Sequence, residues 1–358
     1  MTLLWRLAAV ALSAFFSAST AADQCRIAFD LGSSGIRAGA TDSAATTRAE
    51  LDYLGPLWAG RGLQETEGPT IAALRDLPEK AGFPANCARV GGGFSAWRLA
   101  LQQEPEQLAA LLERLHAGSG VAVLVMSQRR EGAYGYFGAR QLLADKLTTS
   151  HILDIGGGSL QIAGEQTSFG ETLGQKVWHR HLCQEIRNAE STPCALQPLT
   201  GDELTIAREL LTEKLTGVAA ALPGAVSMTA ISRPVSRGVA PAVSRLAGEG
   251  NSPAGFTRQA LTAAIERIAR LSHEETASLL GSKSTYVAYL LSDMLLVEGL
   301  LQATGGDFLN VAELDLTNLP GLLADDQAFA WEQHYACYLD RLRRQGLEAY
   351  ASDPASCR

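Results

Sequence analysis

The segment Asp154-Ile155-Gly156-Gly157-Gly158-Ser159 has an earlier counterpart in Asp30-Leu31-Gly32-Ser33-Ser34-Gly35. Each copy ends an apolar, strand-like run and is followed by a second such run. This pattern predicts two β-hairpins with small residues at their tips. Because the two hairpins lie about a domain apart in the chain, they indicate a duplicated α/β unit with both tips facing one cleft.

The two glycine-rich tips have the chemistry of a phosphate site. Glycine lets backbone N–H groups approach an anion closely, and serine hydroxyls add further hydrogen bonds. A lone turn of this kind is as often a plain hairpin, whereas two facing turns favour a ligand site. The predicted phosphate-binding residues are Gly32, Ser33, Ser34, Gly156, Gly157, Gly158 and Ser159. Asp30 and Asp154 are candidate Mg²⁺ ligands, because magnesium in proteins combines a few carboxylates with substrate phosphates.

The rest of the chain alternates between strand-like and helical patterns, as expected for an α/β protein. Strands are predicted at 25–32, 36–41, 88–91, 121–127, 151–157, 160–165, 225–231 and 308–314. Helices are predicted at 64–82, 94–115 with a break at Pro105, 131–147, 200–215 and across 261–301, followed by closing helices. The 131–147 helix is expected to bury Leu142, Leu143 and Leu147. With no low-complexity linker between the halves, the predicted domains are 23–150 and 151–358.

A hydrolytic site also needs a group that orients or deprotonates water, and Glu131 is the candidate. It lies just beyond the apolar strand 121–127 and therefore near the mouth of the cleft. Its alternative role is that of a carboxylate stabilised at a helix N-terminus. Arg129 and Arg130 beside it would stabilise its charged form and bind phosphate, or they are solvated surface.

Composition and charge restrict the protein class. The chain has 358 residues, a net charge of −8 and a sequence pI near 5.4, which argues against a nucleic-acid binder with a broad basic surface. Residues 1–22 have the layout of a signal peptide, with an apolar run at 7–16. That run is shorter than the roughly 18 residues that span a bilayer, so we expect cleavage, export and no stable membrane insertion afterwards.

The chain has six cysteines, an even number that predicts disulfides in an oxidising compartment. Their spacing favours the pairs Cys183–Cys194 and Cys337–Cys357, each closing a short loop, and leaves Cys25 for Cys87. Other connectivities remain open on the sequence alone.

Two further motifs have simpler interpretations than a ligand site. Gly281-Ser282-Lys283-Ser284-Thr285 lacks the first spaced glycine of a phosphate-binding loop, and a turn between helices is the better interpretation. His179 and His181 would point the same way on a strand and could bind a metal, but without a third ligand a solvated strand edge is favoured.

The quoted motifs resemble those of the exopolyphosphatase and guanosine-pentaphosphate phosphohydrolase family, in the sugar kinase, heat-shock chaperone and actin superfamily. The resemblance covers most of the mature chain. The segments 29–34 and 153–161 look like the family's two phosphate motifs, and Gly93-Phe94-Ser95-Ala96-Trp97-Arg98 is similar to its Ala-Thr-Ser-Ala-Leu-Arg element. Residues 126–138 fall where the family has its catalytic glutamate, with a Glu-Gly-x-Tyr-Gly pattern closer to the apyrase-type nucleoside triphosphate diphosphohydrolases.

The resemblance implies an α/β fold of two ribonuclease-H-like (actin-like ATPase) domains with the active site in the cleft between them. It implies that Glu131 positions the attacking water, that Gln161 and Arg98 support phosphate binding, and that a divalent cation is the cofactor. It also supports the Cys25–Cys87 pair, since these residues begin neighbouring strands of that fold. The expected substrate is inorganic polyphosphate or a nucleotide, and the expected location is a bacterial periplasm.

Two segments depart from the family pattern. Ser127-Gln128-Arg129-Arg130 replaces a Ser-Gly and acidic sequence, and Ile231-Ser232-Arg233-Pro234-Val235-Ser236-Arg237-Gly238 replaces a small, glycine-rich loop. The second change would add phosphate contacts or block a nucleobase, which favours polyphosphate over nucleotides. These departures also leave open a protein that binds a phosphate chain or nucleotide without hydrolysing it.

Overall fold

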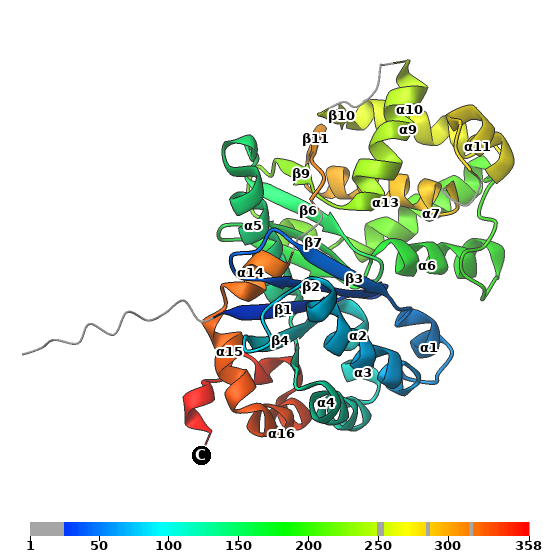
Figure 1. The fold of residues 1–358 in the computed structure, drawn as a ribbon. Helices are drawn as coiled ribbons and strands as arrows, with labels where there is room; N and C mark the ends of the chain where they lie inside the picture. Colours follow the sequence, from blue (N-terminus) through cyan, green and yellow to red (C-terminus); the bar gives the residue numbers. More distant parts are fainter. Residues whose placement is uncertain (1–24, 249–253, 284–286, 315–317, 358) are drawn as a thin grey trace, which may run out of the picture.

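The computed structural model describes residues 25–248, 254–283, 287–314 and 318–357. The predicted signal peptide, 1–22, lies outside these residues. Two mixed β-sheets, each flanked by helices, form the α/β fold, with the lower lobe in Figure 1 built on the first sheet and the upper lobe on the second.

The first sheet has the order β3-β2-β1-β4-β5. Its strands are β1 (Arg26–Leu31), β2 (Gly35–Ala40), β3 (Thr46–Glu50), β4 (Ala88–Gly93) and β5 (Ala122–Val125). The three N-terminal strands are antiparallel, while β4 and β5 continue parallel to β1. The helices of this half are α1 (Leu54–Trp58), α2 (Glu67–Lys80), α3 (Ser95–Gln103), α4 (Pro105–Ser119) and α5 (Gln128–Leu143).

The second sheet has the order β10-β11-β9-β6-β7-β8. Its strands are β6 (His151–Ile155), β7 (Leu160–Gly164), β8 (Ser168–Glu171), β9 (Met228–Ala230), β10 (Gly255–Thr257) and β11 (Phe308–Val311). Its helices are α6 (Gln175–Arg187), α7 (Gly201–Lys214), α8 (Val218–Ala221), α9 (Ala240–Ala247), α10 (Arg258–Ile268), α11 (His273–Leu280) and α13 (Leu290–Ala303).

The two sheets repeat one topology, which confirms the predicted duplication. In both, two antiparallel hairpin connections are followed by two parallel neighbours, so β6, β7, β8, β9 and β11 correspond to β1 to β5. The hairpin registers agree as well, because Asp30 lies opposite Arg37 and Asp154 lies opposite Gln161. Each aspartate therefore occupies the same position in its hairpin.

The closing helices α14 (Leu319–Leu323), α15 (Asp326–Gln333) and α16 (Tyr335–Gln345) pack on the first sheet. They are the orange and red helices beside β1 and α4 in Figure 1. Tyr335 donates its hydroxyl hydrogen bond to the Val123 carbonyl, and the Tyr338 hydroxyl accepts one from the Val125 N–H. The first hydrophobic core therefore combines residues from both ends of the chain. The predicted division at residue 150 instead placed the closing helices in the second domain.

Three local predictions differ from the structure. Helix α5 begins at Gln128 and buries Tyr134 and Ala139, whereas Leu142 is exposed, because α5 packs through its small residues against β7 and α14. The helical stretch 261–301 contains several helices rather than one. His179 and His181 lie on α6 and not on a strand, since the apolar residues there follow a helical spacing.

The described residues contain three disulfides, Cys25–Cys87, Cys183–Cys194 and Cys337–Cys357. This confirms the predicted connectivity, and no cysteine is left free. Cys25 precedes β1 and Cys87 precedes β4, so the first disulfide joins the starts of two neighbouring parallel strands. Within the described ranges, no helix combines the length and the apolar character needed to cross a membrane.

Candidate active site

A cavity of about 360 Å³ lies between the two hairpin tips. This volume falls within the range of small-molecule sites, roughly 300–1,000 Å³. Most of the residues predicted from the sequence line it: Asp30, Gly32, Ser33, Ser34, Glu131, Asp154, Gly156, Gly157, Ser159 and Gln161. Gly158 and Arg98 are not among the lining residues.

Each hairpin tip is closed by the same kind of backbone hydrogen bond, and the two tips lie close together. The Gly32 N–H donates to the Gly35 carbonyl at 3.0 Å, and the Gly156 N–H donates to the Ser159 carbonyl at 2.8 Å. A Cβ atom placed on Gly157 would lie 2.4 Å from Ser33 Oγ, which shows how closely the second tip approaches the first. A side chain at this position would displace the Ser33 hydroxyl, so glycine favours the close approach of the two turns.

Glu131 is held at the wall of the cavity by two buried side chains. It lies in the first turns of α5, whose N-cap, Ser127, accepts a hydrogen bond from the Arg130 N–H. Its Oε2 accepts from Arg98 at 2.7 Å and from Gln161 Nε2 at 2.9 Å, and the whole residue is 8% exposed. Both bonds fall on Oε2, so among the described contacts Oε1 keeps its lone pairs for a ligand.

Arg98 connects three parts of the site from behind. Its guanidinium donates to the Met126 carbonyl after β5, to Ser159 Oγ in the second turn, and to Glu131. Arg98 is 3% exposed. Through these contacts Arg98 positions the Glu131 carboxylate and the second turn. Its predicted role in binding phosphate stays a prediction.

Asp30 is the penultimate residue of β1 and lines the cavity. Burial raises the pKa of its carboxyl to about 6, and the nearby charge of Glu131 adds to this shift. Arg37 and a hydrogen bond from Asn318 act in the opposite direction. The Asn318 Nδ2 donates to Asp30 Oδ2 at 3.4 Å. Asn318 also lines the cavity, and its buried Oδ1 has no hydrogen-bond partner among the described residues. Sequence reasoning missed Asn318, which comes from the far end of the chain and belongs to no motif.

Four cationic residues line the same cavity: Arg37, Arg48, Lys176 and Arg233. Arg129 and Arg130 do not. Arg130 instead lies 3.6 Å from Asp325 and over the ring of Tyr350, and Arg129 is exposed. The arginines that neighbour Glu131 in sequence, Arg129 and Arg130, are therefore not the cations that line the cavity with it.

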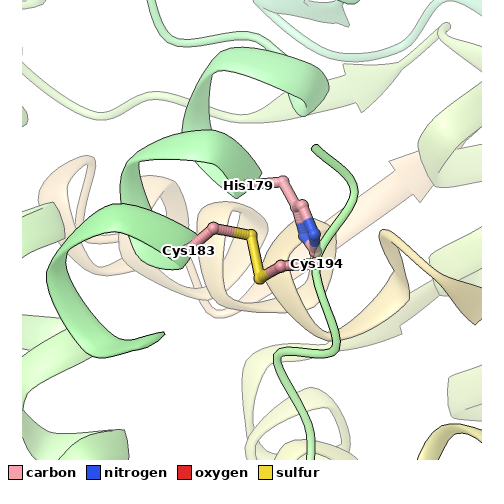
Figure 2. A group of neighbouring side chains, drawn as sticks. All are labelled: His179, Cys183 and Cys194. Atoms are coloured by element: carbon pink, nitrogen blue, oxygen red, sulfur yellow. A yellow bond between two sulfur atoms is a disulfide. The ribbon is translucent and has the colours of Figure 1, made fainter. Parts of the chain in front are cut away.

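The described residues contain one group with metal-ligand spacing away from the cavity: His179, Cys183 and Cys194. Figure 2 shows the two cysteine sulfurs joined in a disulfide beside the histidine ring. A disulfide sulfur carries no thiolate to donate to a metal. His179 is buried, which lowers its pKa to about 4, and its Nδ1 contacts Ser292. This group is structural.

Replacing Gly174 with alanine is expected to displace the second turn. The new Cβ would lie 2.5 Å from both the Gly156 carbonyl oxygen and the Ser159 nitrogen, which are backbone atoms that cannot rotate away. We expect a loss of roughly 1–3 kcal/mol in unfolding free energy, together with weaker binding of tripolyphosphate. Thermal unfolding and calorimetric titration measure the two effects.

Gly201→Ala is the matched control, because its Cβ would meet nothing within 4 Å. It should leave both quantities near the wild-type values. Equal stability and binding in the Gly174 variant would contradict the close packing against the turn.

No protein-family model matches the chain, and no curated protein matches it. Solved structures do. A Ppx/GppA family member from Aquifex aeolicus aligns with a TM-score of 0.61 at 16% identity, over 84% of this chain and 96% of that one. An exopolyphosphatase from Cytophaga hutchinsonii aligns with a TM-score of 0.59 at 14% identity, over 84% and 96%.

An exopolyphosphatase-like protein gives a TM-score of 0.60 at 14% identity, over 84% of this chain and 98% of that one. At these identities the likeness concerns the fold. Together with the repeated sheet topology, it shows that this chain has the two-domain, actin-like α/β fold of the Ppx/GppA phosphatase structures.

Proposed function

We propose that this protein is an exported, metal-dependent phosphoanhydride hydrolase that releases the terminal phosphate of inorganic polyphosphate or a related phosphate chain. One observation carries the proposal. A carboxylate, Glu131, held by Arg98 and Gln161, faces a cavity formed by two glycine-rich turns that each follow an aspartate. The fold shared with solved exopolyphosphatase structures supports it.

The two turns would bind the terminal phosphate. The backbone N–H of Gly157, with the hydroxyls of Ser33, Ser34 and Ser159, supplies donors around the cavity, whereas the Gly32 and Gly156 N–H groups close the two turns. Such donors are fixed before the substrate arrives, so they stabilise the charge that develops on the transferred phosphoryl group without reorganising. In phosphoryl transfer, positioning and electrostatic stabilisation account for most of the catalysis.

Glu131 would orient the attacking water through Oε1. The water oxygen bonds to the terminal phosphorus as the bond from phosphorus to the bridging oxygen breaks, and the water proton passes to Glu131. The shortened chain leaves with the bridging oxygen. Gln161 and Arg98 fix Oε2, so the carboxylate presents one orientation to the water.

A divalent cation such as Mg²⁺ fits the donors at this site. Asp30 and Asp154 are carboxylates at equivalent strand ends, and the amide oxygen of Asn318 is buried beside Asp30 without a partner among the described residues. Oxygen donors of this kind are what magnesium binds. Bound there, the cation would neutralise charge on the phosphate oxygens. It would also favour the ionised form of Asp30, whose pKa burial has raised to about 6.

The cavity walls favour a phosphate chain over a nucleotide. Four of the lining residues are cationic, which offsets the four carboxylates of Asp30, Glu50, Glu131 and Asp154, and none of the described lining residues is aromatic. A nucleobase site usually offers an aromatic ring to stack on, whereas a polyphosphate requires cations along its length. The three disulfides support export, because such bonds persist in oxidising compartments such as a bacterial periplasm.

The test is phosphate release by the purified protein with Mg²⁺, comparing long-chain polyphosphate, tripolyphosphate, ATP and ADP. We expect release from the polyphosphates, loss of this activity with a chelator, and recovery on adding Mg²⁺. Release from ATP and ADP alone would make the protein an apyrase-like hydrolase. Binding without release from any substrate would show a phosphate-chain sensor and reject the enzyme.

A further inference from the structure

A second group of polar residues faces the cavity beside the second turn, and neither the turns nor Glu131 accounts for it. Ser232 and Arg233 follow β9 and line the cavity. Ser232 is 5% exposed, and its Oγ has no hydrogen-bond partner among the described residues. A buried hydroxyl without a protein partner that lies at a cavity wall is available to hydrogen-bond a ligand there.

The sheet topology places this group next to the phosphate cradle. Strands β6 and β9 are parallel neighbours, with Leu153 opposite Ala230, and the Ile231 N–H donates to the Leu153 carbonyl. Asp154 and Ser232 therefore lie at the same edge of the sheet, where the adjacent strands β6 and β9 end. Neighbouring strands lie roughly 4.8 Å apart, which is close enough for one phosphate chain to contact both.

The backbone here also favours an anion. Ser232 and Arg233 directly precede the helical turns 234–239, which continue into α9. The Ser232 carbonyl accepts a hydrogen bond from the Ser236 N–H, so the serine occupies the start of this helical segment. The positive end of the helix, the Arg233 guanidinium and the buried hydroxyl thus lie together at one wall.

We propose that Ser232 and Arg233 form a second phosphate subsite, which binds the third phosphate group of the chain, counted from the terminal one that is cleaved. This inference rests on the proposed function for the direction of the chain, although binding alone can test it. The subsite makes affinity depend on chain length, because pyrophosphate would fill the cradle whereas longer chains would also contact Arg233. The phosphate groups of a nucleotide have the same chemistry as those of polyphosphate. Comparing polyphosphates with ADP therefore shows which of the two ligands the subsite binds.

The experiment uses Arg233→Gln and Ser232→Ala, with Arg237→Gln as the matched control. Arg237 lies on the same helical segment, is exposed and pairs with Glu313, and it does not line the cavity. Dissociation constants are measured by calorimetry for pyrophosphate, tripolyphosphate, long-chain polyphosphate and ADP. Each change is also placed in a Glu131→Gln background, so that turnover does not alter the ligand.

Arg233→Gln is expected to weaken binding of tripolyphosphate and long chains about tenfold, because it removes charge-assisted hydrogen bonds. Ser232→Ala should weaken the same ligands about threefold by the same reasoning. Pyrophosphate affinity should change by less than about twofold in both, and Arg237→Gln should match the parent. ADP weakened as much as tripolyphosphate would assign the subsite to nucleotides and overturn the polyphosphate interpretation.

Equal weakening of pyrophosphate and long chains would overturn the subsite, as would unchanged affinity for all ligands or an effect of Arg237→Gln equal to that of Arg233→Gln. These outcomes are separate from a failure of the proposed function. If the wild-type protein releases no phosphate, the enzyme is rejected, yet a length-dependent loss of binding in Arg233→Gln still establishes the subsite.

Discussion

Glu131→Gln should lower kcat by about 10²–10⁴-fold, because the amide can no longer accept the proton of the attacking water. Glutamine keeps the shape of the side chain and an oxygen that can still accept from Arg98 and Gln161. Binding of the phosphate chain should therefore remain close to the wild-type value. Initial rates of phosphate release and calorimetric titration of the same preparations measure the two quantities.

The variant also removes the charged partner of Arg98, which is 3% exposed. We expect this to lower the free energy of unfolding by roughly 1–3 kcal/mol, so thermal unfolding must show that the assays use folded protein. Glu165→Gln, an exposed position at the end of β7, is the control for the same chemical change. A wild-type kcat in the Glu131 variant would assign the water to another group.

The parts of the fold that the sequence could predict are those encoded locally. The repeated pattern of apolar run, aspartate and glycine-rich turn predicted both hairpins and the placement of their tips at one cavity, and the structure adds that their registers are equivalent. Glycine and aspartate leave a clear signal because few other residues allow a close backbone approach or supply a carboxylate at a strand end. The candidate residues of each turn are therefore recognisable within a segment of six residues.

The parts that it could not predict depend on contacts between distant segments. Helices α14 to α16 belong to the first core although they follow the second sheet, and no local pattern specifies which sheet an apolar helix face covers. For the same reason Asn318, which contacts Asp30 across 288 positions, had no recognisable motif. Arg129 and Arg130 show the converse, since neighbours of Glu131 in sequence lie away from the cavity.

Asp293→Asn should flatten the dependence of stability on pH between about pH 4 and pH 8. Asp293 lies on α13, is 3% exposed, and accepts a hydrogen bond from Gln175 through Oδ2, while its Oδ1 has no partner among the described residues. Burial raises the pKa of its carboxyl from an ordinary 3.8 to about 8, and the bond from Gln175 opposes this shift. The group is therefore a neutral acid near pH 7.

The sign of the effect follows from proton binding. Between the two pKa values the folded state keeps the proton and the unfolded state releases it, so unfolding becomes easier as pH rises. The stabilising contribution is fully present below pH 3.8 and is lost as pH rises through about 8, with a limiting slope of roughly 1.4 kcal/mol per pH unit. Asparagine does not titrate, so the variant lacks this loss and should be more stable than the wild type above pH 8.

Thermal and urea unfolding from pH 4 to pH 9 measure the effect, with the exposed Asp145→Asn as the control for an aspartate-to-asparagine change. Gln175 gives this test a functional readout, because its backbone N–H donates to the Gly156 carbonyl of the second turn. An asparagine that still binds the Gln175 side chain should preserve phosphate binding at pH 7. A pH profile identical to the wild type would mean that folding does not raise the pKa of the Asp293 carboxyl.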